Sequence, residues 1–128
     1  MLRGLEEVPA SQPSPFGVLS PEPTVIILFN DWALYRMEHG TKTATSRTKR
    51  YGIPGDVFES GLVDSTGKLR RYVITTITEM TLGEVAEKHY IEEGVISKEE
   101  FVHIWKQIYP LRGFVPSQVV FFHRFVPI

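Results

Sequence analysis

The apolar residues fall into short runs with different spacings, and these spacings predict the elements of the chain. Residues 24–29 form a continuous run of β-branched and aromatic residues, which is typical of a buried strand. Bulky side chains occupy both faces of a strand expected at residues 69–78, and residues 118–126 predict a closing strand. A short strand is expected at residues 57–58, with a hairpin turn at residues 64–67 leading into the next strand.

Three further stretches have apolar residues at helical spacing and recognisable end signals. Asn30 or Asp31 can cap a first helix that stops at Gly40, because glycine readily adopts a left-handed conformation. Two later helices are each marked by a capping box: Thr81 with Glu84, and Ser97 with Glu100. The order β-α-β-β-β-α-α-β favours an α+β fold, a small closed or nearly closed β-barrel with flanking helices.

Length and composition limit the protein to one domain of ordinary globular type. The chain has 128 residues, no cysteine and a formal net charge of −1. Prolines predict a non-regular N-terminal arm over residues 1–23, packed on a body that covers residues 24–128. No apolar run approaches the roughly 20 residues that span a bilayer, and no signal-peptide pattern opens the chain. We therefore expect a cytoplasmic protein with no membrane partner, cofactor or metal; the sequence gives no indication of its oligomeric state.

Charge is unevenly spread along the chain, with basic residues in the first half and acidic residues later. A basic face on a nearly neutral protein suits local contact with phosphate or a polyanion such as RNA. The residues expected to contribute to such a face are Arg36, Lys49, Arg50, Arg70 and Arg71.

The segment Gly40–Arg47, with the sequence Gly-Thr-Lys-Thr-Ala-Thr-Ser-Arg, carries the strongest candidate chemistry. Strand alternation places Thr45 and Arg47 on one face, and Lys42 can swing toward them if the segment begins as a loop. A lysine whose pKa is lowered can then take the proton of a threonine hydroxyl, which becomes a nucleophile. An arginine can hold a carbonyl oxygen or a phosphate. The alternative is a solvated basic edge strand without chemistry.

Glu93 is the candidate proton donor, because it adjoins Glu92 and neighbouring like charges raise one pKa. Its place at a helix end, near the negative end of the dipole, indicates a partner cation. A solvated helix terminus is the alternative. Tyr109, at another helix end before a proline, can line a pocket or cap the core. The four histidines show no spacing typical of metal ligands.

Taken together, these motifs resemble the ASCH domain. The resemblance covers residues 25–126 and rests on Gly40–Arg47, Gly55-Asp56, Thr81-Leu82, Glu87-Lys88-His89, Glu93 and Tyr109-Pro110. It implies a β-barrel of the PUA-like superfamily and a role with RNA or modified nucleosides. The pattern is most similar to that of the small bacterial acetylcytidine amidohydrolases, which implies Lys42 as general base, Thr45 as nucleophile and Glu93 as proton donor. Arg47 and Tyr109 would contact the substrate.

Two other functions remain open for a chain of this pattern: a non-catalytic RNA-binding module and an ASCH-type ribonuclease. The N-terminal arm and an insertion at residues 111–117 depart from the amidohydrolase pattern, and both can reshape the mouth of a pocket. The amidohydrolase hypothesis requires Thr45 within hydrogen-bond reach of Lys42, with Glu93 facing both. The RNA-binding hypothesis requires a continuous basic face beside a shallow cleft.

Overall fold

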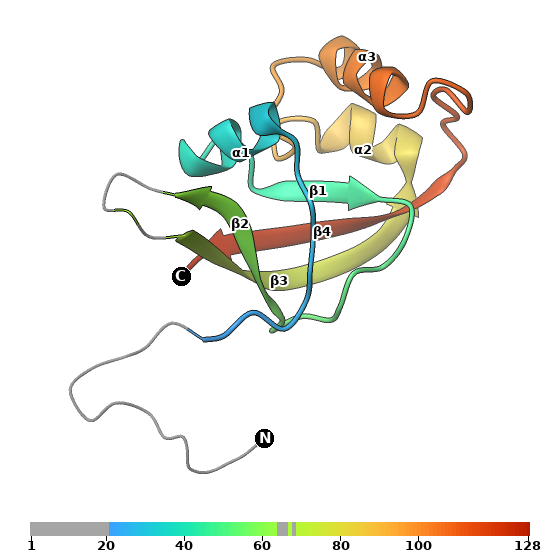
Figure 1. Ribbon diagram of the computed structural model, residues 1–128. Helices are drawn as coiled ribbons and strands as arrows, with labels where there is room; N and C mark the ends of the chain where they lie inside the picture. The colour runs from blue at the N-terminus through green and yellow to red at the C-terminus, as the bar shows by residue number, and fades with distance from the viewer. Residues whose placement is uncertain (1–20, 64–66, 68) are drawn as a thin grey trace, which may run out of the picture.

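The computed structural model describes residues 21–63, 67 and 69–128 (Figure 1). Residues 1–20 of the expected arm, and most of the expected turn at 64–67, lie outside the described residues. The elements are α1 (Asp31–Glu38), β1 (Ala44–Arg47), β2 (Val57–Val63), β3 (Leu69–Thr81), α2 (Leu82–Lys88), α3 (Lys98–Ile108) and β4 (Val119–Pro127). None of the described helices is long and apolar enough to cross a membrane.

The four strands form one antiparallel sheet in the order β1-β4-β3-β2. Figure 1 shows that the sheet curls and that all three helices lie on the same side of it. A register shift between Ile74 and Thr76 interrupts the pairing of β3 with β4, and such a bulge increases local bending and twist. The result is a half-barrel with three flanking helices, which confirms the expected α+β class.

The expected strand at residues 24–29 is wrong, because this segment is extended but belongs to no sheet. The backbone N–H groups of Thr24 and Val25 both donate to the carbonyl of Val57, so no ladder forms. Ile27 is buried, whereas Ile26 and Leu28 are each 77% exposed. The continuous apolar run therefore hides an alternating pattern, in which one face packs on the body and the other faces outward.

The helix end signals of the sequence are confirmed by the contacts of the caps. Asn30 Oδ1 accepts a hydrogen bond from the N–H of Ala33 at the start of α1, and Gly40 follows the helix with a φ of +77°. The hydroxyls of Thr81 and Ser97 accept from the N–H groups three residues on, at the starts of α2 and α3. These caps fix where each helix begins, and hence where the loops between them run.

Two groups of buried side chains hold the layers together. The first lies between α2, α3 and the β1–β4 part of the sheet, and comprises Ala44, Leu82, Val85, Ala86, Val95, Phe101, Trp105, Val120 and Phe122. The second lies between α1 and the other strands, and comprises Ile27, Met37, Phe58, Tyr72, Ile74 and Phe125. Ala44, in β1, belongs to the first group, so β1 is anchored to the core by its own side chain.

Replacing Leu82 by alanine should destabilise the protein by about 2–5 kcal/mol, because this side chain is fully buried and its loss leaves a cavity. Leu111→Ala is the matched control, since Leu111 is fully exposed and the same substitution there should change stability by less than about 0.5 kcal/mol. Urea unfolding of both variants measures the difference. Equal effects at the two positions would contradict the described packing of α2.

Candidate functional site

The start of β1 is fixed by two neighbouring segments that lie far apart in the sequence. The N–H of Lys42 donates to the carbonyl of Arg36 at the end of α1. The next two N–H groups, of Thr43 and Ala44, both donate to the carbonyl of Glu92 at 2.8 and 3.0 Å. The segment between α2 and α3 is thereby docked onto β1, which brings Glu93 beside Lys42.

Lys42 and Glu93 form a buried ion pair, with 3.0 Å between Lys42 Nζ and Glu93 Oε1. The two residues are only 4% and 5% exposed. Lys42 Nζ also donates to the carbonyls of Ala44 at 2.9 Å and of Glu93 at 3.2 Å. An ammonium has three protons, and here each one finds an acceptor. Burial lowers the pKa of Lys42, while the carboxylate of Glu93 opposes that shift. Lys42 is the cation that the position of Glu93 led us to expect.

The two hydroxyls of β1 have different partners. Ser46 Oγ donates to the second oxygen of Glu93, Oε2, at 2.5 Å. Thr45 Oγ1 accepts from Arg47 Nε at 3.0 Å. Among the described residues no hydrogen bond joins Thr45 to Lys42, so the expected swing of Lys42 toward Thr45 does not occur in this arrangement. Lys42 stays on the side of Ser46, where strand alternation puts it and where Glu93 offers a carboxylate.

Arg47 is held in a fixed orientation at the end of β1. Its Nη2 donates to the carbonyl of Leu28 at 2.7 Å, and its guanidinium lies 4.7 Å from the centre of the Phe29 ring. Burial lowers the pKa of Arg47, yet an arginine remains protonated in proteins. Arg47 therefore supplies a fixed positive charge beside Thr45.

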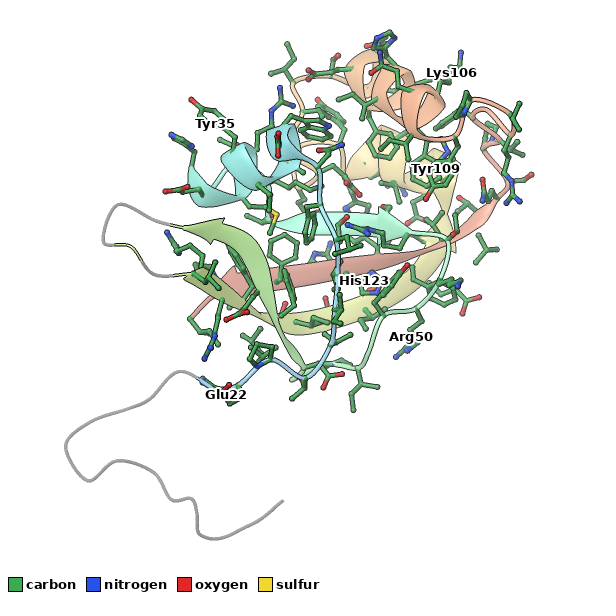
Figure 2. All side chains as sticks on the ribbon, in the orientation of Figure 1. Glu22, Tyr35, Arg50, Lys106, Tyr109 and His123 are labelled. Atoms are coloured by element: carbon green, nitrogen blue, oxygen red, sulfur yellow. The ribbon has the colours of Figure 1, made fainter. Side chains whose placement is uncertain are left out.

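These polar groups lie at a pocket of about 370 Å³. Its apolar wall includes the aromatic rings of Phe29, Trp32, Phe101, Trp105 and Tyr109, and its polar lining includes Asn30, Lys42, Thr45, Ser46, Arg47 and Glu93. Tyr109 follows the last turn of α3 (Figure 2), and its ring lies 4.7 Å from that of Trp105. The four residues expected at one site from the sequence, Lys42, Thr45, Arg47 and Glu93, thus line one pocket with Tyr109. Aromatic walls with a few charged groups suit a flat, partly polar ligand.

Further contacts hold the segment that carries Glu93. Arg124 of β4 binds Glu92 with two hydrogen bonds, and this arginine lowers the pKa of the Glu92 carboxyl. Arg36 donates to the carbonyl of Gly94. Gly94 has a φ of +89°, and a Cβ built on it would lie 2.7 Å from Lys42 Cβ. The adjacent acids Glu92 and Glu93 therefore do different things: one fastens the segment and the other faces the pocket.

The basic residues expected to form an RNA-binding face have separate surroundings. Arg36 pairs with Glu100 and Arg71 pairs with Glu59. Lys49 and Arg50 follow β1 and are exposed, with Arg50 on the outside of the loop that leaves β1 (Figure 2). Arg47 of β1 lies opposite Phe121 of β4 in the strand register. The carbonyl of Arg71, in β3, accepts from the N–H of Ile128, just past the other end of β4. The two arginines therefore lie about 20 Å apart along β4. Arg70, half-buried, adjoins Arg71 on β3.

Sequence reasoning missed Ser46 and, apart from Tyr109, the aromatic wall. Ser46 shares a strand face with Lys42, and this alternation was the signal that could have identified it.

His123 is fully buried opposite Thr45, where its Nδ1 donates to the carbonyl of Phe121 and its Nε2 accepts from the N–H of Tyr51. Burial lowers the pKa of His123, so the ring is neutral and its role is structural. In the described part of the chain, no group of three or more His, Cys, Asp or Glu residues could hold a metal ion.

Comparison with solved structures identifies the fold. The ASCH domain of Lactobacillus crispatus JV V101 matches with a TM-score of 0.60 at 13% identity, over 76% of this chain and 70% of that one. This chain has the fold of an ASCH domain. A similar fold occurs in protein EF3133 of Enterococcus faecalis V583, of family DUF984, with a TM-score of 0.56 at 19% identity over 88% of this chain and 78% of that one. It also occurs in the hypothetical protein PH0355, with a TM-score of 0.59 at 19% identity over 80% and 97% of the two chains. No protein-family model and no curated protein matches the sequence.

Gly94→Ala should disturb the site of this ASCH fold more than a comparable glycine substitution elsewhere. Alanine at a left-handed position costs about 1–2 kcal/mol, and at Gly94 its Cβ would also press against Lys42. Gly113→Ala is the control, because Gly113 has a φ of +73° but open space around its Cα. Chemical denaturation should show a larger loss of stability for Gly94→Ala. Equal losses would mean that Lys42 is not held against Gly94.

Proposed function

We propose that the protein acts in RNA or nucleoside metabolism by taking a modified pyrimidine nucleoside, such as acetylcytidine, into this pocket and hydrolysing its exocyclic amide. The observation that carries the proposal is the buried Lys42–Glu93 pair in a pocket that also holds two hydroxyls and an arginine. Paired ionisable groups in a cleft are typical of acid–base sites. The ASCH fold is compatible with this function, but a fold alone does not define a reaction.

The aromatic lining suits the base of the nucleoside. A pyrimidine can stack on flat side chains such as Phe29, Trp32 and Tyr109, and this stacking is favourable for any base. Arg47 lies at the same pocket with its position fixed by Thr45 and Leu28. A fixed guanidinium beside the hydroxyl can stabilise the negative charge that develops on an acyl oxygen during attack.

In the proposed reaction, Lys42 first passes one proton to Glu93, which leaves a neutral amine and a neutral carboxyl group. Lys42 then takes the proton of Thr45, and the Thr45 oxygen bonds to the acyl carbon. When the carbon–nitrogen bond breaks, the leaving nitrogen receives the proton carried by Glu93. Water hydrolyses the resulting ester, which releases the acid and restores Thr45. The burial that lowers the pKa of Lys42 favours its neutral form.

This sequence requires Thr45 and Lys42 to come into hydrogen-bond contact when substrate binds. Without ligand, Thr45 is bonded to Arg47 and Lys42 to its three acceptors. Hydrogen bonds at catalytic sites are often long or misaligned before substrate binds. The proposal needs the Lys42 amine to leave the carbonyl of Ala44 and turn toward Thr45.

Thr45→Val should abolish hydrolysis of acetylcytidine to cytidine, because valine keeps the shape of threonine without its hydroxyl. Thr45→Ser retains a hydroxyl and should retain measurable turnover. Liquid chromatography of reactions with wild type and both variants detects the cytidine formed. Since Lys42 is buried against a carboxylate, removing it would leave Glu93 unpaired, and the Thr45 variants are the cleaner test.

Full turnover by Thr45→Val would show that Thr45 is not the nucleophile. If wild-type protein releases no cytidine from acetylcytidine, the amidohydrolase proposal fails for this substrate. Circular dichroism of each variant establishes that it is folded before its activity is compared.

The second candidate is a pocket that binds RNA without cleaving it, and one observation favours it. All three protons of Lys42 have acceptors, so in the unliganded site Lys42 is an ammonium paired with Glu93 and does not act as a base. Lys49 and Arg50 are exposed after β1 and form no ion pair with another described residue, so they are available to phosphates.

For RNA binding, Lys49→Ala should weaken affinity for single-stranded RNA and reduce the slope of log K against log salt by about 0.7, the value for one phosphate contact. Lys106→Ala is the matched control, because Lys106 is an exposed lysine on α3, away from the segment that carries Arg50 (Figure 2). Fluorescence anisotropy at several salt concentrations provides both quantities. Equal effects of the two variants would indicate general charge attraction and not a defined RNA surface.

A further inference from the structure

Ser46 occupies a position that the proposed reaction leaves without a role. Its hydroxyl is 7% exposed, lines the pocket, and lies 2.5 Å from Glu93 Oε2. It is the next residue after Thr45 in β1, yet both side chains line the same pocket. Because β1 is an edge strand, the pocket can reach side chains on both of its faces.

Each oxygen of the Glu93 carboxylate already accepts one side-chain hydrogen bond in this arrangement. Oε1 accepts from Lys42 and Oε2 accepts from Ser46. Lys42 and Ser46 are therefore the two side chains already placed to exchange a proton with Glu93. Lys42 is already the source of that proton in the proposed reaction, which leaves the Ser46 hydroxyl as the route outward.

We propose that Ser46 is a catalytic proton relay, which carries the proton of Glu93 to the leaving nitrogen of the substrate. The inference rests on the proposed amidohydrolase function and extends it to a residue that the sequence did not single out. A hydroxyl suits this task because it can accept one proton and donate another at the same time.

The protons of the relay balance at each step. Lys42 delivers its proton to Oε1, and a half-turn of the carboxyl group exchanges the two oxygens, so that the protonated oxygen faces Ser46. The hydrogen bond is then reversed: Glu93 donates and Ser46 Oγ accepts. The Ser46 hydrogen then points to the substrate nitrogen. As the carbon–nitrogen bond breaks, the nitrogen takes the Ser46 hydrogen and Ser46 takes the hydrogen of Glu93. Glu93 becomes a carboxylate again, and Lys42 holds the proton of Thr45 as an ammonium.

When water hydrolyses the ester on Thr45, the relay carries protons in the opposite direction. Water attacks the ester carbon and gives a proton to Ser46, which passes its own to Glu93. The ester carbon–oxygen bond breaks, and Lys42 returns a proton to the Thr45 oxygen. The free acid leaves, and the neutral Lys42–Glu93 pair is restored for the next turnover.

The test compares two substrates with leaving groups of different basicity in wild type, Ser46→Ala and Ser46→Thr. Acetylcytidine releases an amine that must be protonated, whereas 4-nitrophenyl acetate releases a phenolate that is stable as an anion. Ser46→Ala should lower the rate of acylation by acetylcytidine by about 10²–10⁴-fold, the contribution of general acid catalysis. The initial burst of 4-nitrophenolate, which reports acylation by the ester, should keep its wild-type rate, because that leaving group needs no proton. Ser46→Thr keeps a hydroxyl at the same position and should restore amide hydrolysis.

Three results would overturn the relay. Full amide turnover by Ser46→Ala would show that no proton passes through residue 46. An equal loss in the acylation rates of both substrates, in a variant whose thermal unfolding shows it to be folded, would make Ser46 merely structural. An acetyl group found on Ser46 by mass spectrometry would make it the nucleophile instead. In each of these cases wild-type turnover of acetylcytidine still supports the proposed function, whereas absence of wild-type turnover overturns both proposals.

Discussion

The burial of Lys42 against Glu93 is the constraint on which the rest of the site depends. Moving a single charge out of water costs several kcal/mol, and each of these two groups is acceptable inside the protein only because the other is there. The two residues are 51 positions apart in the sequence. Lys42 lies just before β1, and Glu93 lies in the segment between α2 and α3. The two parts of the chain must therefore be joined closely, with little tolerance for a shift of either one.

The way these parts are joined explains several features that would otherwise look unrelated. The N–H groups of Thr43 and Ala44 bind the carbonyl of Glu92, and Gly94 leaves room for Lys42 where a Cβ would not fit. Arg124 holds the side chain of Glu92 from β4, and Arg36 holds the carbonyl of Gly94 from α1. Contacts from α1, β1, β4 and the segment between α2 and α3 thus all hold this one ion pair in place. Rigid support of this kind is what a site with a defined geometry requires.

Sequence reasoning predicted the elements best where the signal is local. The caps at Asn30, Thr81 and Ser97 act within three residues, so their effect can be read from neighbouring letters. The prediction of a strand at residues 24–29 was wrong, because a strand forms only where another strand pairs with it. The segment has the composition of a buried strand, but its backbone-to-backbone hydrogen bonds within the described residues go only to the carbonyl of Val57. No feature of the run itself indicates that a ladder is missing.

The same difference between local and distant information applies to the site. Lys42, Thr45, Arg47 and Glu93 were predicted to share a pocket, and all four line it. The expectation that Lys42 would turn toward Thr45 was wrong, because the choice depends on the side of β1 to which the Glu93 segment docks. Strand alternation allows Lys42 only two directions, and the docked carboxylate decides between them. Ser46 gains its contact with Glu93 from that outcome, because alternation places it on the face of Lys42 and Thr45 on the other.

The two hydroxyls of β1 contact groups of opposite charge, so the two parts of the polar lining differ chemically. Thr45 is next to the cation Arg47, which favours loss of its proton, and Ser46 is next to the anion Glu93, which favours retention of its proton. Two chemically similar groups, adjacent in one strand, are thereby made different: one as a site for negative charge and the other as a donor. An amide held between them would meet a potential nucleophile on one side and a proton source on the other. That separation results from the edge position of β1, since an interior strand would pair on both sides and leave less room for charged partners at its margin.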